Sequence, residues 1–271
     1  MSFIHARHIS KTFSGRNGSD STVAIGNISL DIQEKEFIAL VGPSGCGKST
    51  FMLMVAGLEK PTSGELTIEG LPIIGPDHQR AIVFQEFLLF PWKTVQGNIE
   101  FGPKLNKVKK RQYEVLSRDL IRLVGLEGFE HCYPYELSGG MKQRVAIARA
   151  LANKPKVLLM DEPFGALDAL TRESMQIELQ KIWQNAQCTV LFITHSITEA
   201  IFLADRVIVM SNRPGYVKKE LPIELPRPRT REVFTSDIFR QYEKVLKACI
   251  WEEDQAVTER EVSTATAESF A

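Results

Sequence analysis

The chain has 271 residues, and its 33 Lys and Arg balance its 33 Asp and Glu, so the formal net charge at pH 7 is zero. This length fits one large domain or two small ones, the composition is that of an ordinary soluble globular protein, and the even charge argues against a long electrostatic footprint on nucleic acid. No apolar run approaches the roughly 20 residues of a membrane-spanning helix, and the N-terminus lacks the apolar stretch of a secretory signal.

The first strands alternate apolar and polar residues. Residues 2–13 and 23–32 have this pattern, which predicts two half-buried strands, and the polar residues 14–21 between them predict an exposed loop. After a turn at residues 60–64, residues 65–70 alternate again. The early part of the chain is therefore expected to combine antiparallel strands with the start of a parallel α/β core.

A glycine-rich segment lies between a buried strand predicted over residues 37–41 and a helix predicted over residues 51–56. It matches the phosphate-binding pattern G-x-x-x-x-G-K-S/T in the context that this pattern requires, with the residues Gly42, Pro43, Ser44, Gly45, Cys46, Gly47, Lys48, Ser49 and Thr50. Backbone N–H groups and the helix dipole would attract phosphate, Lys48 would reach the β- and γ-phosphates, and the Ser49 hydroxyl would bind Mg²⁺. A plain glycine turn would not require Lys followed by Ser.

The middle of the chain carries a glutamine at a strand end and an unusually apolar segment. A strand predicted over residues 81–84 ends at Gln85, and an apolar stretch follows where a surface loop would be polar, namely Phe87, Leu88, Leu89, Phe90, Pro91 and Trp92. Core packing and a docking surface both explain these residues. The basic residues 104–111 are interpreted as a solvated face, and residues 113–124 have helical spacing that ends at Gly125.

Two further segments place polar groups at element ends. Ser138, Gly139 and Gly140 open a helix with a capping hydroxyl and approachable backbone N–H groups, which suits an anion, although a capped helix with glycines for packing fits as well. A strand over residues 157–160 ends in Asp161 and Glu162, a pair that suits Mg²⁺ binding by the first and water activation by the second.

Another strand, residues 189–194, ends at His195. A lone histidine at such a place is more often structural, but here several strand ends point to one crevice, where open α/β sheets bind ligands. A further strand is predicted over residues 206–210, and residues 221–229 are expected to cross the surface in extended form. Residues 232–251 are expected to form an amphipathic helix. The last residues are expected to be disordered.

In this order, the motifs resemble the nucleotide-binding subunit of an ATP-binding cassette (ABC) transporter over roughly residues 2–216. The resemblance implies an α/β P-loop NTPase fold with a RecA-like parallel-sheet core, an N-terminal antiparallel β subdomain and a helical subdomain, about residues 93–153, that carries the signature motif. It implies an ATPase domain over residues 1–230, a C-terminal helical extension over residues 231–254 and a disordered tail over residues 255–271.

The resemblance also implies a site: a head-to-tail dimer with two ATP molecules sandwiched between the subunits. Phe13 would stack on adenine, Glu162, His195, Lys48 and Gln85 would be catalytic, and Ser49, Gln85 and Asp161 would hold Mg²⁺. The signature residues that would contact the nucleotide from the other subunit are Ser138, Gly139, Gly140 and Gln143. Relatives usually carry Asp where this chain has Ser196, which leaves the local hydrogen bonding open.

Finer features look like the importers for nitrate, sulfonate and taurine: residues 74–77 ahead of residues 80–85, the Pro-Trp segment after Gln85, and residues 163–172. A transmembrane permease would then dock near residues 87–92, a solute-binding protein outside the cytoplasm would act indirectly, and this subunit would lie on the cytoplasmic face of the inner membrane. A soluble ABC ATPase acting on DNA or ribosomes and an importer of a different solute are the alternatives, although soluble relatives usually carry two cassettes or a long coiled coil.

The four cysteines contain no C-x-x-C pair, so the sequence indicates a reduced setting and gives no support for metal ligation by Cys or His. Cys46 lies inside the phosphate loop at a helix N-terminus, where thiolate character is favoured. We therefore expect a thiol reagent to block ATP hydrolysis and ATP to protect against it.

Overall fold

The computed structural model describes residues 2–15 and 21–250. The chain divides into two compact units. The first unit consists of Met1–Gly75, Ile193–Leu225 and Arg231–Ala271, and the second unit consists of Pro76–Phe192 and Pro226–Thr230. The chain therefore passes from the first unit to the second and back twice, and each unit is described by itself below.

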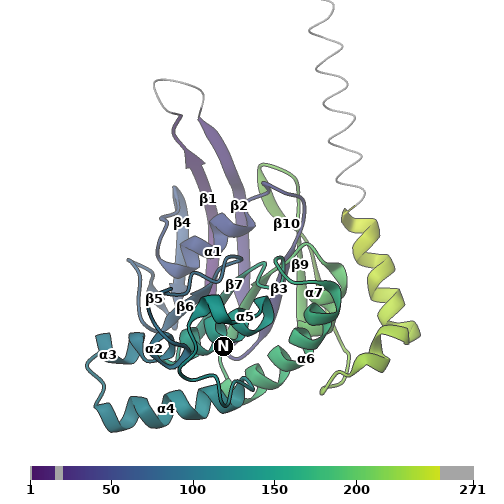
Figure 1. Ribbon diagram of the computed structural model, residues 1–271. Coiled ribbons are helices and arrows are strands. Elements are labelled where there is room, and N and C mark those ends of the chain that lie inside the picture. The colour runs from purple at the N-terminus through teal and green to yellow at the C-terminus, as the bar shows by residue number, and fades with distance from the viewer. Residues whose placement is uncertain (1, 16–20, 251–271) are drawn as a thin grey trace, which may run out of the picture. The chain divides into compact units, whose positions relative to one another are not determined.

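The first unit is built on a mixed sheet (Figure 1). Its strands lie in the order β5 (Leu71–Pro72), β4 (Ser63–Ile68), β1 (Ile4–Phe13), β2 (Thr22–Ile32), β10 (Gly215–Pro222), β9 (Arg206–Met210) and β3 (Phe37–Val41). The pairs β4/β5, β1/β4, β1/β2 and β9/β10 are antiparallel, whereas β2/β10 and β3/β9 are parallel. The predicted mixture of antiparallel strands with the start of a parallel core is confirmed.

The residue pattern explains why these strands form where they do. All five residues of β3 are buried, as expected of a continuous apolar run in a central strand, whereas β2 has exposed and buried residues in turn over much of its length. Two helices complete the ordered core of this unit, α1 (Lys48–Ala56), which contacts β2, and α7 (Ile197–Leu203), which contacts β3. The apolar residues of α7 from Ala200 to Leu203 are buried.

The second unit combines three strands with most of the helices. Its elements are β6 (Arg80–Val83), α2 (Val95–Ile99), α3 (Phe101–Leu105), α4 (Lys110–Leu123), η2 (Pro134–Glu136), α5 (Gly139–Leu151), β7 (Val157–Asp161), α6 (Ala169–Ala186) and β8 (Thr189–Ile193), whose last residue falls in the first unit. β6 and β7 are parallel neighbours, with β8 beyond β7. The helices expected over residues 113–124 and after Ser138 are both present, and the first begins three residues earlier than predicted.

Residues 221–229 were expected to cross the surface, and Glu224, Pro226 and Pro228 are exposed as predicted. Arg229 differs, because it is only 2% exposed. Its backbone N–H donates to Gln180 Oε1 and its carbonyl accepts from Gln180 Nε2, both at 2.9 Å, while the Arg227 guanidinium lies 4.5 Å from the Trp183 ring. Residues 226–230 are therefore fixed to α6, because the buried amide of Gln180 gives this segment the hydrogen bonds that a strand partner would otherwise supply.

The chain then forms the 3₁₀ helix η3 (Arg231–Thr235) and a helix over residues 237–250, yellow in Figure 1. The expected C-terminal helix is thus present over its described part, whereas the tail predicted over residues 255–271 lies outside the described residues. No helix in residues 2–15 and 21–250 is long and apolar enough to cross a bilayer.

Candidate nucleotide site

The phosphate loop begins where β3 ends, and its backbone has the curled form that the motif predicts. Gly47 is the N-cap of α1 and has φ 98°, a left-handed conformation that a side chain would strain. A Cβ on Gly47 would also lie 2.8 Å from Ile25 Cγ1, so both the space and the backbone at this position require glycine. The loop therefore directs the uncapped start of a nine-residue helix at its interior.

Lys48 lies across the mouth of this loop. Its Nζ donates to the carbonyl oxygens of Gly42 at 2.8 Å and Pro43 at 2.7 Å, and the residue is only 5% exposed. The predicted phosphate-binding ammonium is thus held inside the loop by backbone oxygens, next to the Ser49 hydroxyl at the start of α1.

Cys46 corrects one expectation from the sequence. The residue is 1% exposed, and burial raises the pKa of its thiol, although Lys48 Nζ lies 3.7 Å from Sγ and opposes that shift. The helix start and the ammonium do not compensate for desolvation. Cys46 is therefore a buried thiol and does not have the thiolate character that the sequence predicted.

A glycine far along the chain supports the phosphate loop and was missed by the sequence analysis. Gly215 opens β10, and a Cβ on it would lie 2.0 Å from the carbonyl oxygen of Cys46. No side chain fits there without moving the loop. Because Gly215 lies 169 positions after Cys46, only the pairing of β10 with β2 and β9 indicates that it supports the phosphate loop.

His195 lies near the same end of the sheet as the phosphate loop. The backbone N–H of Thr194 donates to the carbonyl of Leu40 at 3.3 Å, two residues before Gly42. His195 itself is exposed. The Ser196 hydroxyl caps α7 by accepting from the Glu199 N–H at 3.3 Å, which shows that serine does here what an aspartate could do.

Phe13 ends β1 with a ring that is 40% exposed, and Lys11 Nζ lies 4.9 Å from the ring centroid. An exposed aromatic face beside a cation is a suitable surface for a planar base.

Within the second unit, Gln85 lies close to Asp161 and Glu162, the carboxylate pair called the Walker B pair below. A Cβ on Gly165 would lie 3.0 Å from Gln85 Nε2 and 3.4 Å from the Glu162 carbonyl, so the Gln85 amide lies against the turn that follows Asp161 and Glu162. Glu162 has φ 46°, a left-handed conformation that a glutamate rarely adopts. Such strain is typical of functional positions whose surroundings hold the backbone.

The signature residues open α5 as predicted. Ser138 is the N-cap and accepts from the Met141 N–H at 3.3 Å, and Ser138 and Gly139 are exposed. Gly140 is buried, and a Cβ on it would lie 2.8 Å from Thr171 Cγ2. Gln143 has no exposed surface, and neither atom of its amide has a hydrogen bond among the described residues. Its expected contact with a nucleotide stays a prediction that requires this side chain to turn.

Residues 87–92 are fixed by two side chains that the sequence analysis did not single out. Arg149, on α5, donates to the carbonyls of Leu88 at 2.7 Å and Phe87 at 3.2 Å, and its guanidinium lies 5.5 Å from the Phe90 ring. Asn98, fully buried, accepts from the Phe90 N–H at 2.9 Å. Trp92 stays 70% exposed and Leu88 54%. Packing therefore explains part of this segment, whereas a docking role for its exposed residues stays a prediction.

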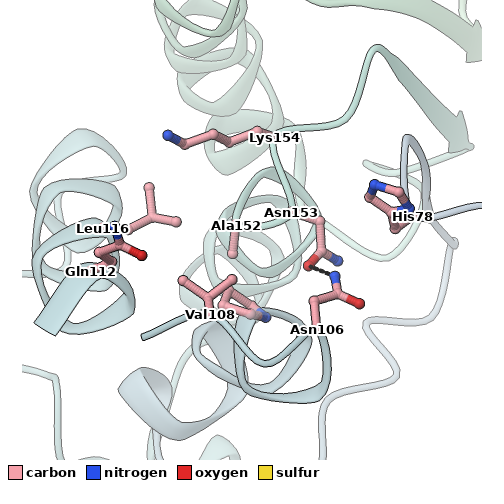
Figure 2. A pocket seen from close by; sticks show the side chains of 9 residues that line it. His78, Asn106, Val108, Gln112, Leu116, Ala152, Asn153 and Lys154 are labelled. Atoms are coloured by element: carbon pink, nitrogen blue, oxygen red, sulfur yellow. Dashed lines mark hydrogen bonds between the residues drawn. The ribbon is translucent and has the colours of Figure 1, made fainter. Parts of the chain in front are cut away.

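A cavity of about 610 Å³ lies in the second unit between the end of α3, the start of α4 and the end of α5, as Figure 2 shows. Asn106 Nδ2 donates to Asn153 Oδ1 at 3.3 Å on one part of its lining, and Lys154, Gln112 and His78 also line it. None of the predicted site residues lines this cavity. The motif residues instead gather at the strand ends and glycine loops described above.

A family model described as ABC transporter matches residues 25–165. The chain belongs to the ABC transporter family. The match takes in the phosphate loop, Gln85, the signature and the Walker B pair, and it confirms the predicted fold class and an ATP-hydrolysing cassette. An ABC cassette also accounts for a phosphate loop and a signature helix on separate units of one chain.

Curated relatives agree with this family. The chain is 51% identical over 218 residues to the nitrate import ATP-binding protein NrtD of Synechocystis sp., covering 80% of this chain and 81% of that protein. It is 42% identical over 269 residues to the taurine import ATP-binding protein TauB of Jannaschia sp., covering 98% of this chain and 100% of that protein. The second alignment includes the C-terminal extension, since it spans nearly the whole chain.

Solved structures of ABC cassettes have the same fold. A dimeric post-hydrolysis state of the cassette MJ0796, bound to ADP and Pi, aligns with a TM-score of 0.69 at 32% identity, covering 82% of this chain and 100% of that one. CbiO1 from Clostridium perfringens aligns with a TM-score of 0.75 at 26% identity, covering 92% and 98%.

Proposed function

We propose that this protein is the ATP-hydrolysing subunit of an importer for a small anion of the nitrate, sulfonate and taurine class. The observation that carries the proposal is the full set of ABC motifs, each of which lies at the end of a strand or at the start of a helix. Similarity to nitrate and taurine import subunits supports the anion class.

The residues divide the chemistry between them. Lys48 offers a preformed ammonium to the β- and γ-phosphates by exchanging its backbone oxygens for phosphate oxygens, and the N–H groups of the loop hold the remaining charge. Glu162 accepts a proton from the attacking water as the bond from the γ-phosphorus to the bridging oxygen breaks. His195 contacts the γ-phosphate.

A divalent cation fits the oxygen donors of this chain. The Ser49 hydroxyl, the Asp161 carboxylate and the Gln85 amide are hard oxygen ligands of the kind that Mg²⁺ prefers, with phosphate and water completing the shell. When bound, Mg²⁺ neutralises charge on the phosphates.

The partners follow from the same site. A second cassette would supply Ser138, Gly139 and Gly140 to each ATP, and the exposure of Ser138 and Gly139 at the start of α5 supports this role. A permease on the cytoplasmic side of the membrane would dock on residues 87–92, where Trp92 and Leu88 leave apolar surface exposed.

The test is ATP hydrolysis by the complex that co-purifies with this tagged chain from native membranes. Hydrolysis is measured with the binding protein and a panel of nitrate, taurine and alkanesulfonates. We expect a permease to co-purify and one of these anions to stimulate hydrolysis.

The control uses chloride and a neutral sugar at the same concentration. Stimulation by the sugar alone would contradict the anion class and leave the importer function standing, whereas the absence of any membrane partner would support a soluble ATPase instead.

A further inference from the structure

The C-terminal extension, η3 and the helix over residues 237–250, is fixed to the first unit along its length. Phe239 and Leu246 are 2% and 0% exposed. The Tyr242 hydroxyl accepts from the Glu224 N–H at 3.0 Å, and Lys218 Nζ donates to the carbonyl of Cys249 at 3.0 Å. Both the beginning and the end of the helix are therefore held against β10 and the residues that follow it.

Aromatic rings join this extension to α7. Phe202, in the last turn of α7, stacks on Phe234 with ring centroids 4.8 Å apart and an interplanar angle of 15°. Phe234 in turn meets the edge of Phe239 at 5.2 Å and 75°. Phe202 is fully buried and Phe234 is half-buried, so the ring of Phe234 is held between one helix on each side.

α7 lies between the extension and the strand that leads to the phosphate loop. It contacts β3 on one side and η3 on the other. β3 ends one residue before Gly42. A displacement of η3 or of the C-terminal helix would therefore be felt at α7 and at its contact with β3, because a close-packed interior transmits strain.

The residues on either side of His195 in the sequence are bonded to the first turn of α7. The Ser196 N–H donates to Thr194 Oγ1 at 3.0 Å, and Thr194 Oγ1 donates to the Glu199 carboxylate, which is buried. The residue before His195 and the residue after it are thus bonded to each other and to α7, so the backbone of His195 must follow any movement of α7.

We propose that Phe234 and Phe239 are positioning residues for ATP hydrolysis, which hold α7 and, through it, His195 at the distance from the phosphate loop that the γ-phosphate requires. The proposal rests on the function proposed above for His195. Covering the apolar face of α7 would need only apolar area, whereas a positioning role also needs the stacked ring of Phe234.

The test compares variants of the full chain in its co-purified complex. Phe234→Ala is expected to lower kcat about tenfold with KM for ATP unchanged, because a small misplacement of a catalytic group slows chemistry while the phosphate loop still binds. Phe234→Tyr keeps the stacked ring and is expected to restore kcat. Val245→Ala, on the helix over residues 237–250 and 36% exposed, is the control and should behave as wild type.

Circular dichroism and thermal melting of every variant separate positioning from folding. A Phe234→Ala protein with wild-type kcat, or one whose kcat falls only in proportion to its unfolded fraction, overturns the proposal, and so does failure of Phe234→Tyr to restore the rate. His195→Ala separates the catalytic role of His195 from the positioning role of Phe234. If His195→Ala is inactive while Phe234→Ala is normal, only the positioning role fails. If the wild-type complex hydrolyses no ATP, the proposed function fails.

Discussion

The phosphate loop and residues 87–92 are held in different ways. The loop is shaped by its own backbone, with glycines at its turns, Lys48 bonded to two loop carbonyls and β10 pressed against Cys46. Residues 87–92 are held from outside, by Arg149 and Asn98 on helices of the second unit, and Leu88 has φ 45°, which costs a leucine roughly 1–2 kcal/mol. The phosphate loop, called the rigid cradle below, is held by its own hydrogen bonds. Residues 87–92, called the restrained segment below, have a strained backbone that Arg149 and Asn98 hold in place.

This contrast suits the two tasks proposed for them. A phosphate site must present the same N–H groups in every cycle, so it gains from a backbone that has one conformation. A segment that responds to a permease must be able to adopt a second conformation, and a segment held only by side-chain contacts can do so when those contacts break.

The largest effect on ATP hydrolysis should come from Glu162→Gln, a substitution that leaves both regions intact. Glu162→Gln removes the proton acceptor but keeps the volume and the capacity to bond, so we expect ATP binding near normal and hydrolysis slower by about 10²–10⁴-fold. Single-turnover hydrolysis and equilibrium binding of labelled ATP measure the two separately. Near-normal turnover would remove Glu162 from the mechanism.

The rigid cradle should fail at Gly215. Gly215→Ala places a Cβ against the Cys46 carbonyl, so the loop must shift at a cost of about 1–3 kcal/mol, and ATP affinity should fall roughly tenfold or more. Titration with a fluorescent ATP analogue measures this. Gly75→Ala, which has open space around its Cβ, is the control and should bind normally.

The restrained segment should fail at Arg149. Arg149→Ala removes two charge-assisted hydrogen bonds and leaves the Phe87 and Leu88 carbonyls unpaired, so we expect a loss of about 1.5–3 kcal/mol in the free energy of unfolding and weaker solute-stimulated hydrolysis. ATP affinity should be unchanged, because the cradle does not depend on Arg149. Urea denaturation and ATP titration test both parts, with Arg118→Ala on the exposed face of α4 as the control. Loss of ATP affinity would break the distinction between the regions.

The smallest effect concerns Cys46. A thiol whose pKa is raised by burial carries less thiolate at neutral pH, so its modification should be slow near pH 7 and should keep accelerating as the pH rises above 9. Mass spectrometry of each cysteine after timed labelling measures this, with the partly exposed Cys132 as the internal control. Labelling of Cys46 as fast as Cys132 at pH 7 would contradict the burial, and protection by ATP remains expected.

Local patterns predicted the motif-bearing elements well. The loop from Gly42 to Thr50, the helix start at Ser138 and the strand that ends at Asp161 were all identified from residues within a dozen positions, because their shape depends on glycines, caps and apolar runs nearby. The attachment of residues 226–230 to α6 was not predicted, since it depends on the buried amide of Gln180, about fifty positions away.

The supporting residues were missed for the same reason. Arg149 lies about sixty positions from the carbonyls that it binds, and Gly215 lies farther still from Cys46. Burial of Cys46 was also not visible locally, because the strands that enclose it come from the last third of the chain. Contacts of this kind carry no signal in a single sequence.

The pairing of β3 with β9 has a consequence for synthesis on the ribosome. Ile38 pairs with Arg206 and Val41 with Val209, and β10 completes the sheet beside β2. The first unit therefore cannot close until more than two hundred residues have been made, whereas residues 76–192, the larger part of the second unit, are synthesised earlier and are expected to begin folding while the nucleotide loop still lacks its partner strands. The nucleotide loop can therefore take its final form only after β9 and β10 have been synthesised.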